Sequence, residues 1–490
     1  MFDRRECPPE RAQEGNTAPG RYFGVVHDTY QAALASHEDG EFTAAVEGYR
    51  DVLAMAPAHV DAACNLGLLL HNGGEYEAAM AAYGAALAAD PGHGGALRGL
   101  GMACYGQGVL QGAVDCYQQL LEQDPDDGES HYNLGVIFFQ QGRLAEALAS
   151  YARAVQANPA NGDAWYNLGI AFKEQGELEE AVTCYESAIE LNPDDADVQY
   201  NLGIVLTELG REEEGVAAFC RTLAIDPAYA AALSHLGVIY HRQGRFDEAI
   251  ASYRQTAALG HNVEATGHIL AALEGTTTEK APTEYVRGLF DGFSERFDHC
   301  LLEELEYKTP MMLQQLLDSL LDGPASFGNV LDLGCGTGLS GMPFRPRAQR
   351  LTGVDLSEGM IAVARRKEVY DRLLVEEIGS FLKRSDETYD LLIATDVLVY
   401  VGGLDELFRA ARGRLCPGAP FLFSTESCSG ADYQLRTSGR YAHSSDYIQT
   451  LAEKHDFTIA TCQAAGIRME RGKWIMGHLW ILRARDAAAV

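Results

Sequence analysis

The 490-residue sequence lacks several features that would assign it to a specialised class of protein. It has no apolar run of membrane-spanning length, and its first residues, MFDRRECPPERAQEG, include no apolar leader segment. Its eleven cysteines are scattered, with no CxxC pair, which is typical of reduced thiols and gives no support for a metal site. We therefore expect a cytoplasmic protein that has no metal cofactor and no membrane partner.

Lysine is nearly absent from the first half of the chain, where Lys173 is the only one between residues 26 and 263. Residues 1–275 carry 14 Lys and Arg against 40 Asp and Glu, whereas residues 276–490 carry 24 against 30. Such a negative field disfavours nucleic acid and steers basic partners toward the surface. The acidity either serves a basic partner or only keeps the first half soluble.

The first half of the chain is dominated by a strict repeat of 34 residues. Six prolines mark it: Pro57, Pro91, Pro125, Pro159, Pro193 and Pro227. A Leu-Gly pair recurs in the same register, at residues 66–67, 100–101, 134–135, 168–169, 202–203 and 236–237. This period is typical of a helix–turn–helix solenoid, in which the glycine lets two helices approach closely. We expect seven units, at 26–59, 60–93, 94–127, 128–161, 162–195, 196–229 and 230–263.

The repeat resembles the tetratricopeptide repeats, which are α-helical solenoids that bind proteins or peptides. Its sixth position is asparagine four times, in Asn65, Asn133, Asn167 and Asn201. By the resemblance, this position lines the concave groove, where carboxamides can both donate to and accept from a peptide backbone. The ladder is similar to that in the repeat region of protein O-GlcNAc transferase. The asparagines either bind peptide or follow the family consensus alone.

The repeat register is lost after His261, and Gly275-Thr276-Thr277-Thr278 predicts a linker. Residues 1–25 before the repeats are expected to form a flexible tail. The aromatic segment from Phe290 to Asp298 is similar to the lid helices that precede the cofactor fold of small methyltransferases. Ordinary packing between domains is the alternative explanation. We assign residues 264–325 to this linker with its lid-like helices and 326–490 to a separate domain.

The second half contains the motif with the most specific chemistry, Asn329-Val-Leu-Asp-Leu-Gly-Cys-Gly-Thr-Gly338. It predicts a buried strand, a glycine-rich turn and then a helix whose N-terminus faces a ligand. Residues 336–341 also fit the G-x-G-x-x-G pattern of nicotinamide-binding folds. Asp332 opposes that reading, because a carboxylate repels a pyrophosphate and attracts the ammonium and sulfonium groups of S-adenosylmethionine.

Acidic residues end the next two predicted strands. Asp355 follows Leu351-Thr-Gly-Val354, where a carboxylate can accept from both ribose hydroxyls. Leu356 and Met360 follow it as apolar candidates to flank adenine. Glu377 and Ile378 end the third strand, near the adenine amino group. Simple capping of strand ends is the alternative role for the three acids.

These motifs occur in the order found in class I S-adenosylmethionine-dependent methyltransferases, which residues 326–490 resemble. The resemblance implies a Rossmann-like α/β domain in which Asp332, Gly334, Cys335, Gly336 and Gly338 hold the methionine end. It is to bacterial predicted methyltransferases that carry tetratricopeptide repeats. The fourth strand ends in TDVLVYVG and lacks the Asn/Asp-Pro-Pro-aromatic motif of enzymes that methylate DNA bases. Nucleic acid is therefore not an expected substrate. Trp474 and Trp480 are assigned to two closing strands and to the core.

Candidates for the acceptor side follow the fifth strand, in Ser438-Gly-Arg-Tyr-Ala-His443. His443 is a candidate base, with capping of the helix at Ser444 as its alternative role. Arg440 is a candidate anchor for a carboxylate, and Tyr441 completes the group. Asp396 and Tyr400 are further candidates.

We therefore predict a methyltransferase with an all-α solenoid that recruits a protein or peptide. Two alternatives are a small-molecule methyltransferase docked onto a biosynthetic complex by its repeats, and an adaptor whose methyltransferase fold has no activity. The sequence predicts neither the methyl acceptor nor the oligomeric state.

Overall fold

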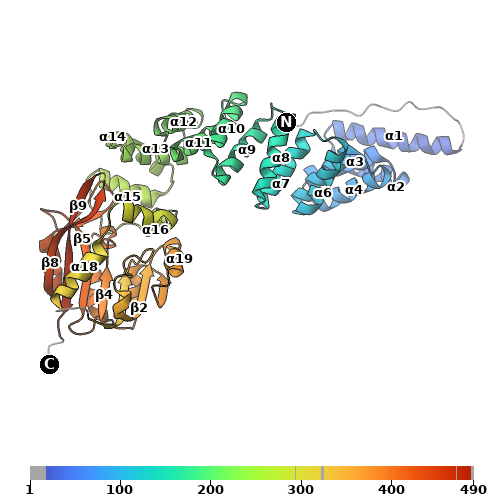
Figure 1. Ribbon diagram of the computed structural model, residues 1–490. Helices are drawn as coiled ribbons and strands as arrows, with labels where there is room; N and C mark the ends of the chain where they lie inside the picture. Colours follow the sequence, from blue (N-terminus) through green and yellow to red (C-terminus); the bar gives the residue numbers. More distant parts are fainter. Residues whose placement is uncertain (1–17, 293, 322–324, 471, 487–490) are drawn as a thin grey trace. The chain divides into compact units, whose positions relative to one another are not determined.

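The computed structural model describes residues 18–292, 294–321, 325–470 and 472–486 (Figure 1). Contacts divide the chain into two compact units, the first ending at Pro227 and the second beginning at Ala228. Most of the predicted tail lies outside the described residues. Its last part, residues 18–25, begins the first helix, so helical structure starts before the predicted boundary at residue 26.

The first unit consists of paired helices joined by short turns. They are α1 Ala18–Glu38, α2 Phe42–Met55, α3 Val60–Asn72, α4 Tyr76–Ala89, α5 Gly94–Gly106, α6 Leu110–Gln123, α7 Gly128–Gln140, α8 Leu144–Ala157, α9 Gly162–Gln175, α10 Leu178–Leu191, α11 Ala196–Glu208 and α12 Glu212–Ile225. Each repeat proline follows the second helix of its pair, where the missing N–H and the fixed φ of proline end the helix.

The Leu-Gly pairs have the packing role that their spacing predicts. A Cβ atom on Gly67 would lie 2.8 Å from the ring of Tyr83, which is itself 4% exposed. Gly135 has the same relation to Tyr151, at 2.6 Å. The glycine in the first helix therefore accommodates the aromatic ring of the second, and this contact recurs from repeat to repeat.

The second unit begins with further helices: α13 Ala230–Arg242, α14 Phe246–Ala258, α15 Val263–Leu273, α16 Thr283–Asp291, α17 Ser294–His299, the π-helical turn η1 Cys300–Glu304 and α18 Thr309–Leu320. The seventh predicted repeat thus forms α13 and α14, and contacts assign it to the same unit as the C-terminal sheet. Residues 276–278 belong to no helix or strand, and they lie within this second unit, where Thr278 bonds to Tyr441.

A sheet follows, with strands β1 Phe327–Leu333, β2 Ala348–Asp355, β3 Arg372–Val375, β4 Leu391–Ala394, β5 Pro420–Ser427, β6 Tyr433–Leu435, β7 Tyr441–His443, β8 Phe457–Glu470 and β9 Lys473–Ala484. The intervening elements are η2 Arg345–Arg347, α19 Glu358–Arg366, α20 Ile378–Arg384, η3 Leu398–Tyr400, α21 Asp405–Arg414 and α22 Ser445–Lys454. The first five strands are parallel in the order β3-β2-β1-β4-β5, and β9 runs antiparallel to β5 and β8.

This strand order places a ligand crevice at the carboxyl end of β1. The chain moves outward from β1 through β2 to β3 and then returns to the other side of β1 as β4. Connections on the two sides of β1 therefore leave in opposite directions, which opens a crevice at the strand ends. Helices cover both faces of the sheet, since Leu331 and Leu333 pack with α20–α22, whereas Val330 packs with α18.

One core prediction is confirmed and another is wrong. Trp480 is 1% exposed and packs in the sheet core, as predicted. Trp474, in contrast, is 44% exposed. Both tryptophans lie in the last strand, β9, whereas β8, the other closing strand, contains neither of them. The pairing of β9 with β5 ends at Gly477, so Trp474 lies on a part of the β8–β9 hairpin that extends past β5.

Candidate functional site

The glycine-rich turn after β1 requires glycine at three positions. Gly334, Gly336 and Gly338 have φ angles of 69°, 51° and 96°, in the left-handed region that other residues rarely adopt. A Cβ atom on Gly334 would lie 2.5 Å from the side chain of Val397, and one on Gly336 would lie 3.8 Å from the ring of Phe297. The expected helix after the turn is wrong. Residues 336–344 form successive turns, since Gly338 and the nearby prolines do not favour a helix.

Asp355 at the end of β2 holds this turn in place. Its Oδ2 accepts a hydrogen bond from the backbone N–H of Gly336 at 2.8 Å, and Oδ1 accepts from that of Ser357 at 2.9 Å. Burial raises the pKa of Asp355 above its usual range, while the backbone donors act in the opposite direction. Each oxygen keeps a second lone pair, so the carboxylate can still accept from a ligand hydroxyl.

Asp332 lies beneath the turn and is fully buried. Its Oδ2 accepts hydrogen bonds of 2.6 Å from both Ser340 and Tyr370, whereas Oδ1 has no partner among the described residues. Burial raises the pKa of Asp332 to about 7, despite the hydrogen bonds that lower it. Asp332 does not line the adjacent cavity, and nor does Gly338, which packs against Tyr370.

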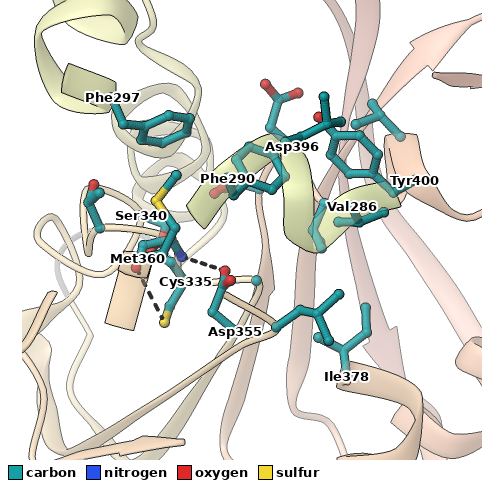
Figure 2. A pocket seen from close by; sticks show the side chains of 18 of the residues that line it. Val286, Phe290, Phe297, Cys335, Ser340, Asp355, Met360, Ile378, Asp396 and Tyr400 are labelled. Atoms are coloured by element: carbon teal, nitrogen blue, oxygen red, sulfur yellow. Dashed lines mark hydrogen bonds between the residues drawn. The ribbon is translucent and has the colours of Figure 1, made fainter. Parts of the chain in front are cut away.

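A cavity of about 380 Å³ opens beside the turn (Figure 2). Among the predicted cofactor residues, it is lined by Gly334, Cys335, Gly336, Asp355, Leu356, Met360, Glu377 and Ile378. Glu377 also caps α20 by accepting from the backbone N–H of Ser380 at 2.7 Å. Burial opposes ionisation of Glu377, but the hydrogen bonds from Ser380 outweigh it and lower the pKa. The structure therefore brings eight of the ten predicted residues to one cavity.

Helices α16 and α17 line one side of the cavity. Figure 2 shows Phe290 and Phe297 beside the turn; their ring centroids are 5.8 Å apart, and Phe290 is 5.5 Å from Tyr400. Both phenylalanines and Val286 line the cavity. The sequence alone suggested either a lid or domain packing, and the structure shows that these helices line the cavity.

Three acidic side chains attach these helices to the sheet domain. Asp291 accepts from the hydroxyl of Ser357 at 2.5 Å, at the N-cap of α19. Asp298 accepts from the hydroxyl of Thr337 in the glycine-rich turn and pairs with Lys367. Glu295 pairs with Arg366 at 2.6 Å. The lid is therefore hydrogen-bonded to the same turn that forms the floor of the cavity.

The other end of the cavity is lined by Asp396, Tyr400, Arg440 and Arg468. Both oxygens of Asp396 accept from Nη1 of Arg468 at 3.0 Å, and Asp396 has a φ of 56°. Arg468 is 3% exposed and also pairs with Glu426. Burial opposes its charge, but the two carboxylates outweigh burial and raise the pKa of Arg468. Arg468 was missed because no local motif surrounds it on β8.

Two predicted catalytic residues are not brought to the cavity. His443 is 1% exposed, and its Nε2 hydrogen-bonds to the carbonyls of Val401 and Gly402, at 2.9 and 3.1 Å. Burial lowers the pKa of His443 to about 4, so the ring is a poor proton acceptor at neutral pH. Ser444, rather than His443, caps α22. Tyr441 is fully buried and hydrogen-bonds to Thr278. These contacts replace the predicted catalytic roles with structural ones.

Three of the four ladder asparagines form bonds between successive repeats. The Nδ2 atoms of Asn167 and Asn201 donate to the hydroxyls of Tyr132 and Tyr166, at 3.2 and 3.0 Å. Asn65 donates to Tyr30 in the same way, 35 residues earlier in the chain, at 3.3 Å. All four asparagines, including Asn133, are partly exposed. The sequence analysis did not anticipate the tyrosine partners, although the constant offset of 35 residues was available as a signal.

Two negative findings concern the described part of the chain. No helix there has both the length and the apolar character needed to cross a membrane. No cluster of three or more His, Cys, Asp or Glu side chains suited to a metal ion occurs among those residues either.

Comparison with protein families agrees with this organisation. The methyltransferase domain family matches residues 331–421, the tetratricopeptide repeat family matches residues 30–94, and the cilia and flagella-associated protein 70 C-terminal domain family matches residues 93–287. Among solved structures, MamA shares 27% identity with a TM-score of 0.32, over 33% of this chain and 94% of that protein.

Curated relatives match through about a third of the chain or less. Nodulation protein S of Rhizobium tropici is 32% identical over 168 residues, which are 30% of this chain and 68% of that protein. The malonyl-[acyl-carrier protein] O-methyltransferase of Serratia marcescens is 34% identical over 100 residues, or 20% of this chain, and the chain spans 37% of its length. The chain therefore belongs to the methyltransferases, and it carries tetratricopeptide repeats before its methyltransferase domain.

Proposed function

We propose that the protein is a class I methyltransferase that uses S-adenosylmethionine. The observation that carries this proposal is the bond between Asp355 and the backbone N–H of Gly336, which joins the ends of β1 and β2 beside the cavity. A Cβ atom on Gly336 would lie 3.8 Å from the ring of Phe297, at the edge of the cavity that both residues line. The residues present thus fit the nucleoside part of this cofactor, because Asp355 lines the cavity and can accept from ribose hydroxyls.

The cavity residues divide into two groups in this proposal. Asp355 accepts from the ribose hydroxyls, while Leu356, Met360 and Ile378 pack against adenine beside Glu377. The glycine-rich turn faces the methionine end, and the buried carboxyl of Asp332 lies behind that turn. S-adenosylmethionine supplies an electrophilic methyl group when it is bound, and the protein positions the acceptor in line with it.

Positioning and exclusion of water are the contributions that the described residues make to the transfer. Phe290 and Phe297 cover the cavity, and their helices are held by Asp291 and Asp298. Asp396 is already engaged by Arg468 and is poorly placed to take a proton. We therefore propose an acceptor that needs no strong protein base.

Calorimetric titration tests the cofactor proposal. We expect S-adenosylmethionine and S-adenosylhomocysteine to bind the wild type, and Asp355→Ala to weaken both by roughly 10- to 100-fold through lost hydrogen bonds to a charged group. Asp371→Ala is a matched control, because this carboxylate lies at the opposite end of β2 and β3, bonded to Arg345. Equal binding by wild type and Asp355→Ala contradicts the proposal.

We further propose that the repeats recruit a protein or peptide, with a basic segment favoured by the acidity of residues 1–275. A cytoplasmic location is part of this proposal, because scattered cysteines without a CxxC pair are typical of reduced thiols. Docking of a small-molecule enzyme onto a biosynthetic complex, or an inactive adaptor, are the competing possibilities. Recruitment predicts that methylation of a protein depends on the asparagines of the repeats. Docking predicts that turnover of a small acceptor does not depend on them, and an inactive adaptor predicts no methylation.

Variants of the asparagine ladder distinguish these possibilities. Replacement of Asn167 and Asn201 by alanine removes carboxamides and also their bonds to Tyr132 and Tyr166. Replacement of the two tyrosines by phenylalanine removes the same bonds and keeps the carboxamides. In a lysate given radiolabelled S-adenosylmethionine, recruitment predicts that protein labelling falls only in the asparagine variant. Equal protein labelling in both variants and the wild type contradicts it.

A further inference from the structure

The hairpin formed by β6 and β7 places one positively charged side chain, that of Arg440, at the cavity. Its turn closes through a bond from the N–H of Arg436 to the carbonyl of Arg440, at 2.8 Å, and Gly439 has a φ of 76°. Arg440 lines the cavity at the end that also contains Tyr400. This hairpin lies outside the parallel strands that hold the proposed cofactor residues.

Helices that precede the sheet domain hold this hairpin turn. Nε2 of His268 in α15 bonds to the carbonyl of Gly439 at 2.9 Å, and Nε2 of His241 in α13 bonds to that of Thr437 at 2.7 Å. A Cβ atom on Gly439 would lie 2.5 Å from the hydroxyl of Tyr285, so glycine is required for this close approach. The residue that follows, Arg440, therefore starts from a fixed backbone.

The guanidinium of Arg440 has donors to spare. Among the described residues its ion pair is with Glu470 at 3.4 Å, and its side chain is 28% exposed. Arg468, in contrast, is paired with two carboxylates at the same end of the cavity. Because arginine has five N–H donors in a planar fork, Arg440 can bind a carboxylate through two parallel hydrogen bonds while it keeps its contact with Glu470.

The surroundings of Arg440 define the ligand further. Leu289, Leu301 and Leu305 line the same cavity as Arg440, and they favour an apolar body for the ligand. Asp396, Glu426 and Glu470 place three carboxylates near the two arginines. A ligand with a single negative charge is less repelled by them than a dianion is. A carboxylate fits this balance better than a phosphate does.

We propose that Arg440 binds a carboxylate of the methyl acceptor, and that the group of the acceptor that enters the cavity is an apolar carboxylic acid, free or carried by a recruited protein. This inference rests on the proposed function, because the cavity must also hold the methyl donor. The helices α13 and α15 then contribute to the acceptor site by fixing the hairpin turn. The sheet domain alone is therefore not the complete acceptor site.

Hexanoate is the probe that tests the proposal, by calorimetry on the full chain with and without S-adenosylhomocysteine. We expect hexanoate to bind the wild type, and Arg440→Gln to weaken binding by roughly 10- to 100-fold through lost charge-assisted hydrogen bonds. Arg436→Gln is the matched control, because this exposed arginine lies on the same hairpin, does not line the cavity and bonds to the carbonyl of Ser427. It should bind hexanoate as the wild type does.

The remaining outcomes separate this inference from the proposed function. Hexanamide should bind much more weakly than hexanoate, and hexylphosphonate should not bind more tightly. The inference is overturned if hexanoate does not bind, if Arg440→Gln binds hexanoate as tightly as the wild type does, or if hexanamide binds as tightly as hexanoate. Tighter binding of hexylphosphonate than of hexanoate also overturns it, because the ligand group would then be a phosphate and not a carboxylate. If hexanoate binds through Arg440 but S-adenosylhomocysteine does not bind, the anion site stands and the proposed cofactor is wrong.

Discussion

The buried carboxyl of Asp332 should make the second unit less stable as the pH rises. In the unfolded chain this group titrates near its usual value of 3.8, whereas burial raises the pKa to about 7 in the folded protein. Below pH ~4 the carboxyl is protonated in both states. Between these values the unfolded state alone releases its proton, so the free energy of unfolding falls as the pH rises. Above pH ~7 both states are ionised and the loss is constant.

The size of this effect follows from the two pKa values. A difference of one in pKa corresponds to about 1.4 kcal/mol, so the full loss is about 4 kcal/mol. About 3 kcal/mol of this loss in the free energy of unfolding occurs between pH 5 and pH 8. Asp332→Asn removes the titration and keeps an oxygen that can accept from Ser340 and Tyr370. Relative to the wild type, the variant should therefore gain about 3 kcal/mol between these two pH values.

Urea unfolding without ligand measures the difference. Trp165 reports the first unit, so a Trp165→Phe background leaves Trp474 and Trp480 to report the second unit by fluorescence. Asp318→Asn is the control, because its ion pair with Arg347 lowers the pKa of Asp318, and the carboxylate is ionised in both states across this range. The reasoning is refuted if the gain of Asp332→Asn is the same at pH 5 and pH 8, or if it decreases.

Three further predictions test the packing, the turn and the hairpin. Gly67→Ala should lower the thermal midpoint of the first unit, because its Cβ overlaps the ring of Tyr83 at a cost of about 1–3 kcal/mol; Gly84→Ala, with open space around it, should raise the midpoint instead. Gly336→Val should abolish calorimetric binding of S-adenosylhomocysteine and keep the circular dichroism spectrum; unchanged binding contradicts a role of the glycine-rich turn in holding the ligand. His268→Ala should weaken hexanoate binding and leave S-adenosylhomocysteine binding unchanged, with partial recovery in His268→Gln; a parallel loss of both ligands indicates general unfolding instead.

The parts of the fold that could be predicted are those specified by local pattern. The 34-residue period identifies the helix pairs, because each unit buries the same residues against its neighbour. The acids that end β1 and β2 could be placed because parallel strands end at one edge of a sheet, and Asp355 does lie beside Gly336. Order along the chain was sufficient for these features.

The parts that could not be predicted depend on contacts between distant segments. His443 has the residue type of a base, but its burial against Val401 is visible only in three dimensions. Trp474 was assigned to the core by residue type alone, although its strand extends past its neighbour. Arg468 lies in β8, which joins the sheet only through its pairing with β9, the strand that follows β8 in the sequence. This pairing brings Arg468 to the cavity. None of these positions has a local motif.

The asparagine ladder shows a third kind of limit. The spacing of Asn167 and Asn201 identified a shared face, and the family resemblance suggested a peptide as the partner. The structure adds tyrosine hydroxyls from the preceding repeat, which occupy amide donors of the ladder. A polar ladder in a solenoid can therefore join repeats as well as bind a ligand, and variants must separate the two roles.

The most direct test of the account is a crystal structure of the protein with S-adenosylhomocysteine. The account predicts that the ribose hydroxyls lie within hydrogen-bond distance of Asp355, that adenine packs beside Ile378, and that the sulfur faces the end of the cavity lined by Tyr400 and Arg440. Density for the ligand at any other place in the protein, or an empty cavity at saturating ligand, would contradict it.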